Sequence, residues 1–342
     1  MTLSNDPIDT TTAPPRGPVP AVATRGAARP PAAGRVLLFA LALGVLGLSG
    51  SGCSIKRVAI NSLGDALAGS GTTFSADDDP ELIKAAVPFS LKLVESLLAE
   101  SPRHRGLLTA AASGFTQYAY AFVQQDADEL RQSDLVRSRE LRGRAKKLYL
   151  RARDYGLRGL DTRRKDFVQA LDKDPRAAVA PLKTADVPLL YWTASAWVGA
   201  ITADKTDSLL ISDLPKVDAM LERALELDET YNHGALPALM VSYEPVRQGV
   251  EGDPYARAEQ RFRRAVEISE GKLAGPYVSL AEAVCIATEN RARFLELLGA
   301  ALAIRLDAAP DSRLANTIMQ GRARWLSAHV DDYFLPALDA KP

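Results

Sequence analysis

The sequence predicts an all-α protein, and three observations point to this class. Of its 342 residues, 47% are hydrophobic and only 6% are aromatic, and alanine and leucine dominate the apolar set, which favours close helix packing over strand pairing. Amphipathic stretches alternate with short segments rich in Gly, Pro or Asp, as in antiparallel helices joined by tight turns. The alternation typical of half-buried strands is absent. The composition also excludes collagen-like, wholly disordered and multi-span membrane proteins.

The charge of the chain is balanced, because 42 Lys and Arg residues accompany 42 Asp and Glu residues. No net field draws nucleic acid onto the molecule, so a nucleic-acid partner is not expected. The two cysteines, Cys53 and Cys285, are too few for a disulfide scaffold or a four-thiol zinc site. Cys285 lies in an apolar helical stretch and is expected to be a buried small residue.

The first 52 residues have the organisation of an export signal. Residues 1–35 are rich in proline, carry scattered arginines and lack apolar periodicity, so they are not expected to fold. Residues 36–48 are uncharged and apolar but shorter than the roughly 20 residues that cross a bilayer. Small residues then lead into Cys53, which looks like the lipidated cysteine of a bacterial lipobox. We expect a signal peptide over residues 1–52 and diacylglycerol on Cys53.

The lipobox departs from the usual pattern at Gly50, where Leu, Val or Ile is common. Two alternatives therefore stay open: a short N-terminal membrane anchor, or a signal cleaved elsewhere that leaves Cys53 as a plain thiol. Ser54, in place of Asp, points to the outer membrane by the familiar enterobacterial sorting rule. Two or three acyl chains give stable anchoring without a spanning helix. The expected location is periplasmic, lipid-anchored to the outer membrane.

Residues 53–80 are expected to form a tether and a first short segment. Glycine, serine and three consecutive aspartates fill its second half. Asp79, Pro80 and Glu81 then supply an N-cap, a first-turn proline and an acidic group near the positive end of the helix dipole. A helix is therefore predicted to begin at this point.

Residues 81–338 are predicted to form TPR-like helical-hairpin repeats that stack into a curved α-solenoid. The pattern places a small residue, a large apolar residue four positions later and an alanine three positions after that, because two helices approach closely only where side chains are small. It occurs in six approximate copies, among them Ala145, Tyr149 and Ala152, and Ala258, Phe262 and Ala265. The alternative is a generic helical bundle in which these alanines mark helix contacts only. A solenoid would offer a concave binding side.

Several segments together resemble the TatT family, the T component of tripartite ATP-independent periplasmic (TRAP) transporter systems. The most specific match is an aromatic helix. Further segments match in the same order along the chain, so the similarity covers about residues 53–338. The segments that carry it are residues 191–201, 232–236, 258–272, 313–316 and 322–326. One departure is Pro237, which follows the second segment where a more aromatic stretch is usual, and which should distort the first turn of its helix or kink it.

This resemblance implies a non-catalytic, lipid-anchored periplasmic protein that is an accessory to TRAP-type transport. It implies homo-oligomers, docking of the substrate-binding P component, and a passage or cavity for small apolar organic ligands. The alternative function is a helical-repeat scaffold for envelope or lipoprotein assembly. The two functions predict different partners. A TRAP accessory should copurify with a periplasmic solute-binding protein, whereas an assembly scaffold should copurify with membrane machinery.

Five aromatic residues are the candidates for ligand or partner binding. Tyr191, Trp192 and Trp197 share one helix but not one face, because Trp197 lies about 120° from Tyr191 and about 140° from Trp192 at 3.6 residues per turn. One ring can therefore line a cavity or a subunit contact while another packs in the core. Tyr243 and Tyr277 are the next candidates. The alternative for each ring is a purely structural role in the core.

The sequence offers no support for catalysis, a metal site or a cofactor. His104, His233 and His329 are isolated from one another and from ligand spacings. No Gly-x-Ser-x-Gly elbow or phosphate loop is present. The run of six basic groups over residues 137–147 is either a docking surface for an acidic partner or a solvated helix face whose stems cover apolar neighbours.

Overall fold

The structure is a computed structural model that describes residues 61–62 and 71–334. The predicted signal peptide, Cys53, most of the tether and residues 335–338 lie outside the described residues. Every regular element in the described part is a helix, which confirms the all-α prediction. None of these helices is long and apolar enough to span a bilayer.

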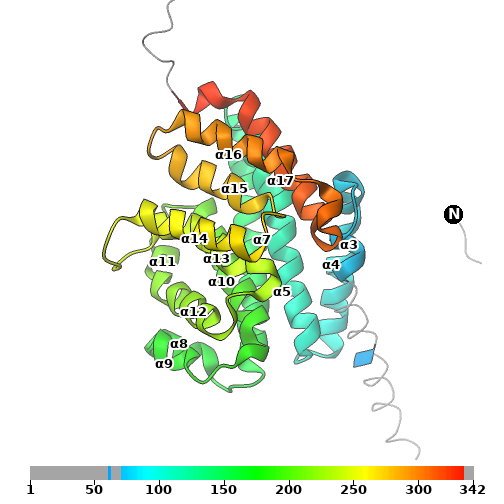
Figure 1. Ribbon diagram of the computed structural model, residues 1–342. Helices are drawn as coiled ribbons and strands as arrows, with labels where there is room; N and C mark the ends of the chain where they lie inside the picture. The colour runs from blue at the N-terminus through cyan, green and yellow to red at the C-terminus, as the bar shows by residue number, and fades with distance from the viewer. Residues whose placement is uncertain (1–60, 63–70, 335–342) are drawn as a thin grey trace, which may run out of the picture. The chain divides into compact units, whose positions relative to one another are not determined.

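The helices follow one another through short connections (Figure 1). The first part of the chain contains α3 (Gly71–Ser75), α4 (Pro80–Glu100), α5 (Arg105–Ala119), η1 (Tyr120–Gln124), α6 (Gln125–Glu129), α7 (Leu135–Asp161), α8 (Phe167–Lys173), α9 (Pro175–Val179), η2 (Thr184–Asp186), α10 (Val187–Ala203), α11 (Ser208–Ser212) and α12 (Leu214–Asp228). The second part contains α13 (Tyr231–Tyr243), η3 (Glu244–Val246), α14 (Pro254–Ile268), α15 (Gly275–Leu280), η4 (Ala281–Cys285), α16 (Arg291–Ala303), η5 (Leu306–Ala308), η6 (Pro310–Ser312), α17 (Arg313–Ala328) and η7 (Val330–Asp332).

Helix α4 begins where the sequence predicts. The Asp79 carboxylate accepts hydrogen bonds from the backbone N–H groups of Glu81 (3.1 Å) and Leu82 (3.0 Å), and Pro80 occupies the first turn. These bonds satisfy donors that the helix itself leaves without partners. The same type of cap occurs at Asp134, Asp174, Asp207, Asp253 and Asn290.

Neighbouring long helices pack on each other: α5 contacts α4, α7 and α10, and α10 also contacts α7, α12 and α13. The contact between α7 and α10 is tight because glycines lie in it. A Cβ on Gly156 would come within 2.1 Å of the Thr193 Oγ1, and one on Gly199 within 2.5 Å of the Tyr149 ring. The pattern residues Ala145 and Tyr149 of α7 are both buried, as their spacing predicts, and the Tyr149 ring lies in this contact.

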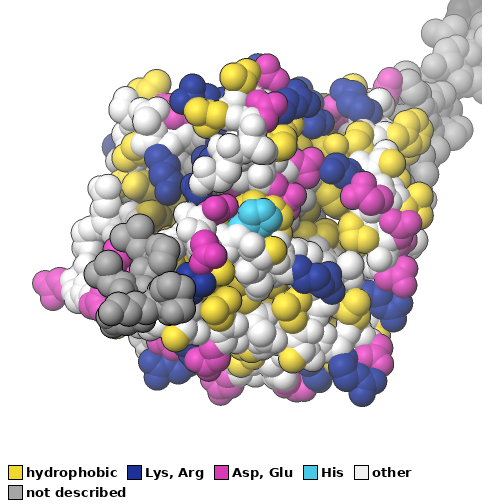
Figure 2. Space-filling view, turned by 90° about the horizontal axis from the view of Figure 1, so that it is seen from above, with side chains coloured by type: hydrophobic (Ala, Val, Ile, Leu, Met, Phe, Trp, Pro, Cys, Tyr) yellow, Lys and Arg dark blue, Asp and Glu magenta, His cyan; other side chains and the backbone are white. Residues whose placement is uncertain are grey.

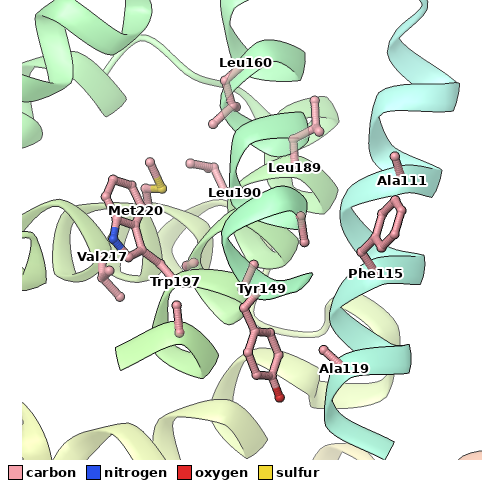
Figure 3. Close-up of a cluster of buried hydrophobic side chains, with 14 of the residues drawn as sticks. Ala111, Phe115, Ala119, Tyr149, Leu160, Leu189, Leu190, Trp197, Val217 and Met220 are labelled. Atoms are coloured by element: carbon pink, nitrogen blue, oxygen red, sulfur yellow. The ribbon is translucent and has the colours of Figure 1, made fainter. Parts of the chain in front are cut away.

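The core divides into two clusters. One extends from Ile83 to Tyr243, and Figure 3 shows side chains of α5, α7, α10 and α12 meeting within it. The other extends from Val241 to Phe334. The helices thus bury their apolar faces against one another, mostly against helices close to them in the chain.

The last long helix returns to the first ones. Helix α17 contacts α3 and α4, the Tyr120 hydroxyl lies 3.6 Å from the Met319 sulfur, and Arg322 lies 3.5 Å from Asp128. In an open arc the two ends would not touch, so the helices of residues 71–334 are more closed than the predicted curved solenoid.

Candidate functional site

Two of the predicted aromatic residues lie in one cluster with a third ring that the sequence did not single out. The Tyr191 ring lies 4.8 Å from the Trp192 ring and 5.5 Å from the Tyr231 ring, in edge-to-face and tilted arrangements. Such offset contacts are the favoured ones between aromatic rings. All three side chains are partly exposed. Burial raises the pKa of Tyr191 to about 12, so its hydroxyl stays protonated at neutral pH.

Trp197 is separated from this cluster and lies in the core. Its side chain is 3% exposed, and Arg153 and Lys216 lie over the ring at 5.0 Å and 5.8 Å from its centre. The indole Nε1 makes no hydrogen bond within the described residues. The different faces of this helix therefore have the different surroundings that the angular spacing indicated.

Tyr243 and Tyr277 differ in their access to solvent. Tyr243 is 1% exposed, and burial raises its pKa well above the ordinary value, with Asp218 nearby adding to the effect. Tyr277 is partly exposed and meets the Phe262 ring edge-on at 5.2 Å. Only Tyr277 of this pair presents surface to a ligand in this conformation.

Helix α13 begins with a strained segment. Asn232, His233 and Gly234 have positive φ angles of 48°, 58° and 83°. Left-handed backbone costs a non-glycine residue roughly 1–2 kcal/mol, and such strain often accompanies functional sites. Pro237 then falls in the first turn of the regular helix, where its missing N–H costs no hydrogen bond. The distortion predicted at Pro237 therefore lies just before it, at Asn232, His233 and Gly234, where the backbone is not helical.

A hollow of about 310 Å³ opens beside this segment. His233, the turn after α14 from Ile268 to Leu273, and the segment from Ala308 to Ser312 form its walls. The buried Asn316 ties α17 to the turn after α14, because its side chain accepts from the Ala274 N–H and donates to the Lys272 carbonyl, both at 2.9 Å. Two of the segments that carry the sequence resemblance, residues 232–236 and 258–272, therefore contribute walls to one hollow, and Asn316 of a third segment supports the wall that follows α14.

A second hollow of about 370 Å³ follows the exposed side of α14. Charged side chains dominate its walls, which are formed by Glu229, Gln260, Arg261, Arg263, Arg264 and Glu267. Arg264 pairs with Glu229 at 2.8 Å across it. The two hollows adjoin at the end of α14, where consecutive residues line them: Glu267 lines the second hollow and Ile268 lines the first.

The junction between α13 and α14 contains a buried carboxylate. Glu244 is fully buried and accepts from Arg257 (2.9 Å) and Arg261 (3.2 Å), and Arg247 approaches it at 3.5 Å. Arg247 also pairs with Asp218 at 2.6 Å. A buried charge surrounded in this way fixes how the helices join, because removing one partner leaves the others unpaired in the interior.

A further ionic cluster was not predicted from the sequence. Arg322 is 5% exposed and donates to Glu282 at 2.6 Å, and its Nη1 has no acceptor within the described residues. Burial raises the pKa of Glu282, and Arg322 opposes that shift. Glu282 lies in η4, a π-helical turn, and such turns are frequent at functional sites. Glu282 and Arg322 lie too far apart in the sequence for any local pattern to reveal the pair.

The basic run of residues 137–147 is mostly engaged within the molecule. Arg142 pairs with Asp128 at 2.7 Å, and Lys146 pairs with Asp204 and Asp207 at 2.7 Å and 2.8 Å. This favours the interpretation as a helix face over the docking surface.

The described residues contain no group of three His, Cys, Asp or Glu side chains placed to hold a metal ion. His104 caps α5 by accepting from the Leu107 N–H, and His329 stacks on the Trp325 ring at 4.3 Å. Cys285 is buried, and burial raises its pKa to about 11, which leaves it an unreactive thiol at neutral pH.

Fold and site together define an all-helical protein whose described surface offers a partly exposed aromatic cluster and two hollows, one of them lined mainly by charged side chains. The family model for the TRAP transporter T-component matches residues 76–334. A protein of Treponema pallidum (strain Nichols), described as an uncharacterized protein, is 32% identical over 319 residues, which are 88% of this chain and 98% of the relative. The chain belongs to the TRAP transporter T-component family.

Proposed function

We propose that this chain is a non-catalytic, lipid-anchored periplasmic lipoprotein that assists a TRAP-type transport system by binding its substrate-binding P component. The family match over residues 76–334 carries this proposal. The anchor is the acylated Cys53, and the membrane is the outer membrane. The chain assembles as a homo-oligomer.

The P component docks over the two adjoining hollows at the end of α14. Their walls expose charged groups and backbone, and the strained His233 segment holds one of them open on its α13 side. Small apolar ligands bind at the partly exposed rings of Tyr191, Trp192 and Tyr231, with Tyr277 as a further contact. Trp197 and Tyr243, the most buried of the candidates, serve the core and do not contact the ligand.

Docking is tested by the retention of a purified periplasmic TRAP substrate-binding protein from the same genome. The unaltered chain should retain it, and Arg263→Glu combined with Lys272→Glu should weaken retention at least tenfold, because each change reverses a charge at one hollow. Lys147→Glu, on the exposed side of α7, is the control and should bind normally. Absence of retention by the unaltered chain contradicts the docking proposal.

Ligand binding is tested by tryptophan fluorescence during titration with a medium-chain fatty acid as an apolar probe. The proposal predicts a saturable change that Trp192→Phe abolishes. Trp325→Phe removes a ring that is also partly exposed but stacks on His329 outside the aromatic cluster, so its titration should match that of the unaltered chain. If Trp192→Phe shows the same fluorescence change as the unaltered chain, the fatty acid binds elsewhere.

The anchor and the assembly are tested separately. Radiolabelled palmitate should enter the chain in cells and should not enter Cys53→Ser, and fractionation should place the labelled protein in the outer membrane. Light scattering of the purified chain should give a mass above that of one copy. A monomer at micromolar concentration contradicts the proposed oligomer.

A further inference from the structure

One end of the helical body is formed by the α4–α5 turn, the α7–α8 turn and the approach to α10. We define this basic end as residues 100–105, 158–166 and 183–186. Hydrogen bonds join its parts, because Arg103 donates to the Thr162 carbonyl and Arg158 donates to the Pro102 carbonyl, each at 3.1 Å. Asp186 binds Arg105 at 2.5 Å and lies 3.6 Å from Arg163.

The charge of the basic end differs from that of the whole chain. Its residues include seven basic and four acidic side chains, a net charge of +3, whereas the full sequence is neutral. The basic members are Arg103, Arg105, Arg158, Arg163, Arg164, Lys165 and Lys183, and the acidic members are Glu100, Asp161, Asp166 and Asp186. Asp186 is 2% exposed, so its charge contributes least at the surface.

Five of the basic residues are exposed, namely Arg103, Arg158, Arg163, Lys165 and Lys183. Lys165 and Lys183 form no ion pair with another described residue. By contrast, the face seen in Figure 2 intersperses side chains of both signs with hydrophobic ones. The basic end therefore has a local excess of positive charge that the face in Figure 2 does not share.

The chain enters the helical body at this same end. The Ser101 hydroxyl donates to the Asn61 side chain at 2.9 Å, and the His104 ring lies 3.2 Å from the Asn61 carbonyl. Cys53 precedes Asn61 by eight residues, which reach at most about 29 Å when fully extended. An acyl group on Cys53 would therefore keep the basic end within that distance of the membrane.

We propose that the basic end binds the anionic phospholipid headgroups of the membrane that holds the chain. This inference rests on the proposed anchoring through Cys53, because the anchor brings the two surfaces together. Each Lys or Arg close to an anionic surface contributes about fivefold in affinity, and the attraction decays within a Debye length of about 10 Å at moderate salt. The contact orients the helical body, with its α4–α5 turn toward the lipid.

The test uses a chain that begins at Ser54, which retains every described helix and carries no acyl group. Its sedimentation is measured with vesicles of phosphatidylcholine alone and with vesicles that also contain phosphatidylglycerol. Binding should require phosphatidylglycerol and should decrease in high salt. Combined Arg163→Gln, Lys165→Gln and Lys183→Gln should weaken binding at least tenfold, given about fivefold for each charge.

The control combines Arg139→Gln, Lys205→Gln and Arg324→Gln, three exposed positions outside the basic end. It changes the net charge by the same amount and should bind nearly as well as the unaltered chain. Equal loss in both triple variants, or equal binding of the unaltered chain to both vesicle types, overturns the inference. Circular dichroism melting of each variant shows that its fold is intact. Palmitate labelling tests the anchor independently, so failure of lipidation and failure of headgroup binding give separate results.

Discussion

Helices α10 and α13 reach their positions by different means. Helix α10 is regular over 17 residues, is apolar on nearly every side and is accommodated by glycines in the contact with α7. Helix α13 starts from a left-handed segment and ends against a buried ion cluster around Glu244. The first arrangement follows from side-chain size along one helix. The second depends on backbone strain and on charges from separate parts of the chain.

The contrast extends to the halves of the described chain that contain these helices. Of the non-glycine residues with positive φ in the described part, only Asp166 precedes α13, whereas Asn232, His233, Glu270 and Glu289 lie in α13 or after it. Two of the four line the hollow beside α13. Strain therefore accumulates where the chain builds recesses, and close packing dominates where it builds a core.

The largest effect is expected from removing the carboxylate at the α13–α14 junction. Glu244→Ala leaves the 6% exposed Arg247 side chain without one partner and takes the shared acceptor from Arg257, so urea unfolding should show a loss of about 3–5 kcal/mol. Glu226→Ala is the control, because its 65% exposed side chain pairs with Arg223 on the surface, and it should cost no more than about 1 kcal/mol. Equal losses of unfolding free energy would mean that the buried cluster around Glu244 stabilises the fold no more than a surface ion pair does.

A smaller loss is expected from filling the contact between α7 and α10. In Gly156→Ala the new Cβ would lie 2.1 Å from the Thr193 Oγ1 and 3.2 Å from its Cα, and such overpacking costs about 1–3 kcal/mol. Gly143→Ala on the same helix has nothing within 4 Å of the added Cβ. It should instead stabilise the chain by up to about 1 kcal/mol, because alanine is the better helix former. The two thermal melts should therefore move in opposite directions.

A gain is expected from relieving the strain in α13. His233→Gly replaces a residue held at a φ of 58° and should raise the free energy of unfolding by about 1 kcal/mol. Ala238→Gly, in the right-handed part of the same helix, should lower it by a similar amount, about 1 kcal/mol. If His233→Gly is also destabilising, contacts of the imidazole outweigh the backbone strain.

The smallest effect concerns the ion pairs of Lys146 on α7 with Asp204 and Asp207, which follow α10. Hydrogen bonding by Lys146 is the main reason that the pKa of Asp204 falls from 3.8 to about 2. The ion pair therefore favours the folded state above pH 3.8 and loses that contribution as the pH falls towards 2. Lys146→Gln should return the pKa of Asp204 towards its ordinary value in an NMR titration. An unchanged pKa would assign the shift to the bonds from Thr206.

The sequence predicted much of the core and less of the site. Asp79 caps α4, and Ala145 and Tyr149 are buried, because capping and helical spacing act within a few turns. Tyr191 and Trp192 were chosen as candidates because they are aromatic residues of one helix, but Tyr231, whose ring lies beside Tyr191, was not, although it directly precedes the Asn232–His233 pair. Its contact with Tyr191 joins two helices that are distant in the sequence.

The amino-acid sequence alone determined the helical class, where the capped helices begin, and which small residues allow helices to approach. These properties depend on neighbours three or four positions away. Only the tertiary structure decided the return of α17 to α3 and α4, the pairing of Arg322 with Glu282 and the meeting of three segments around one hollow. Those features depend on distances between residues that the chain separates by tens of positions, and local periodicity carries no information about them.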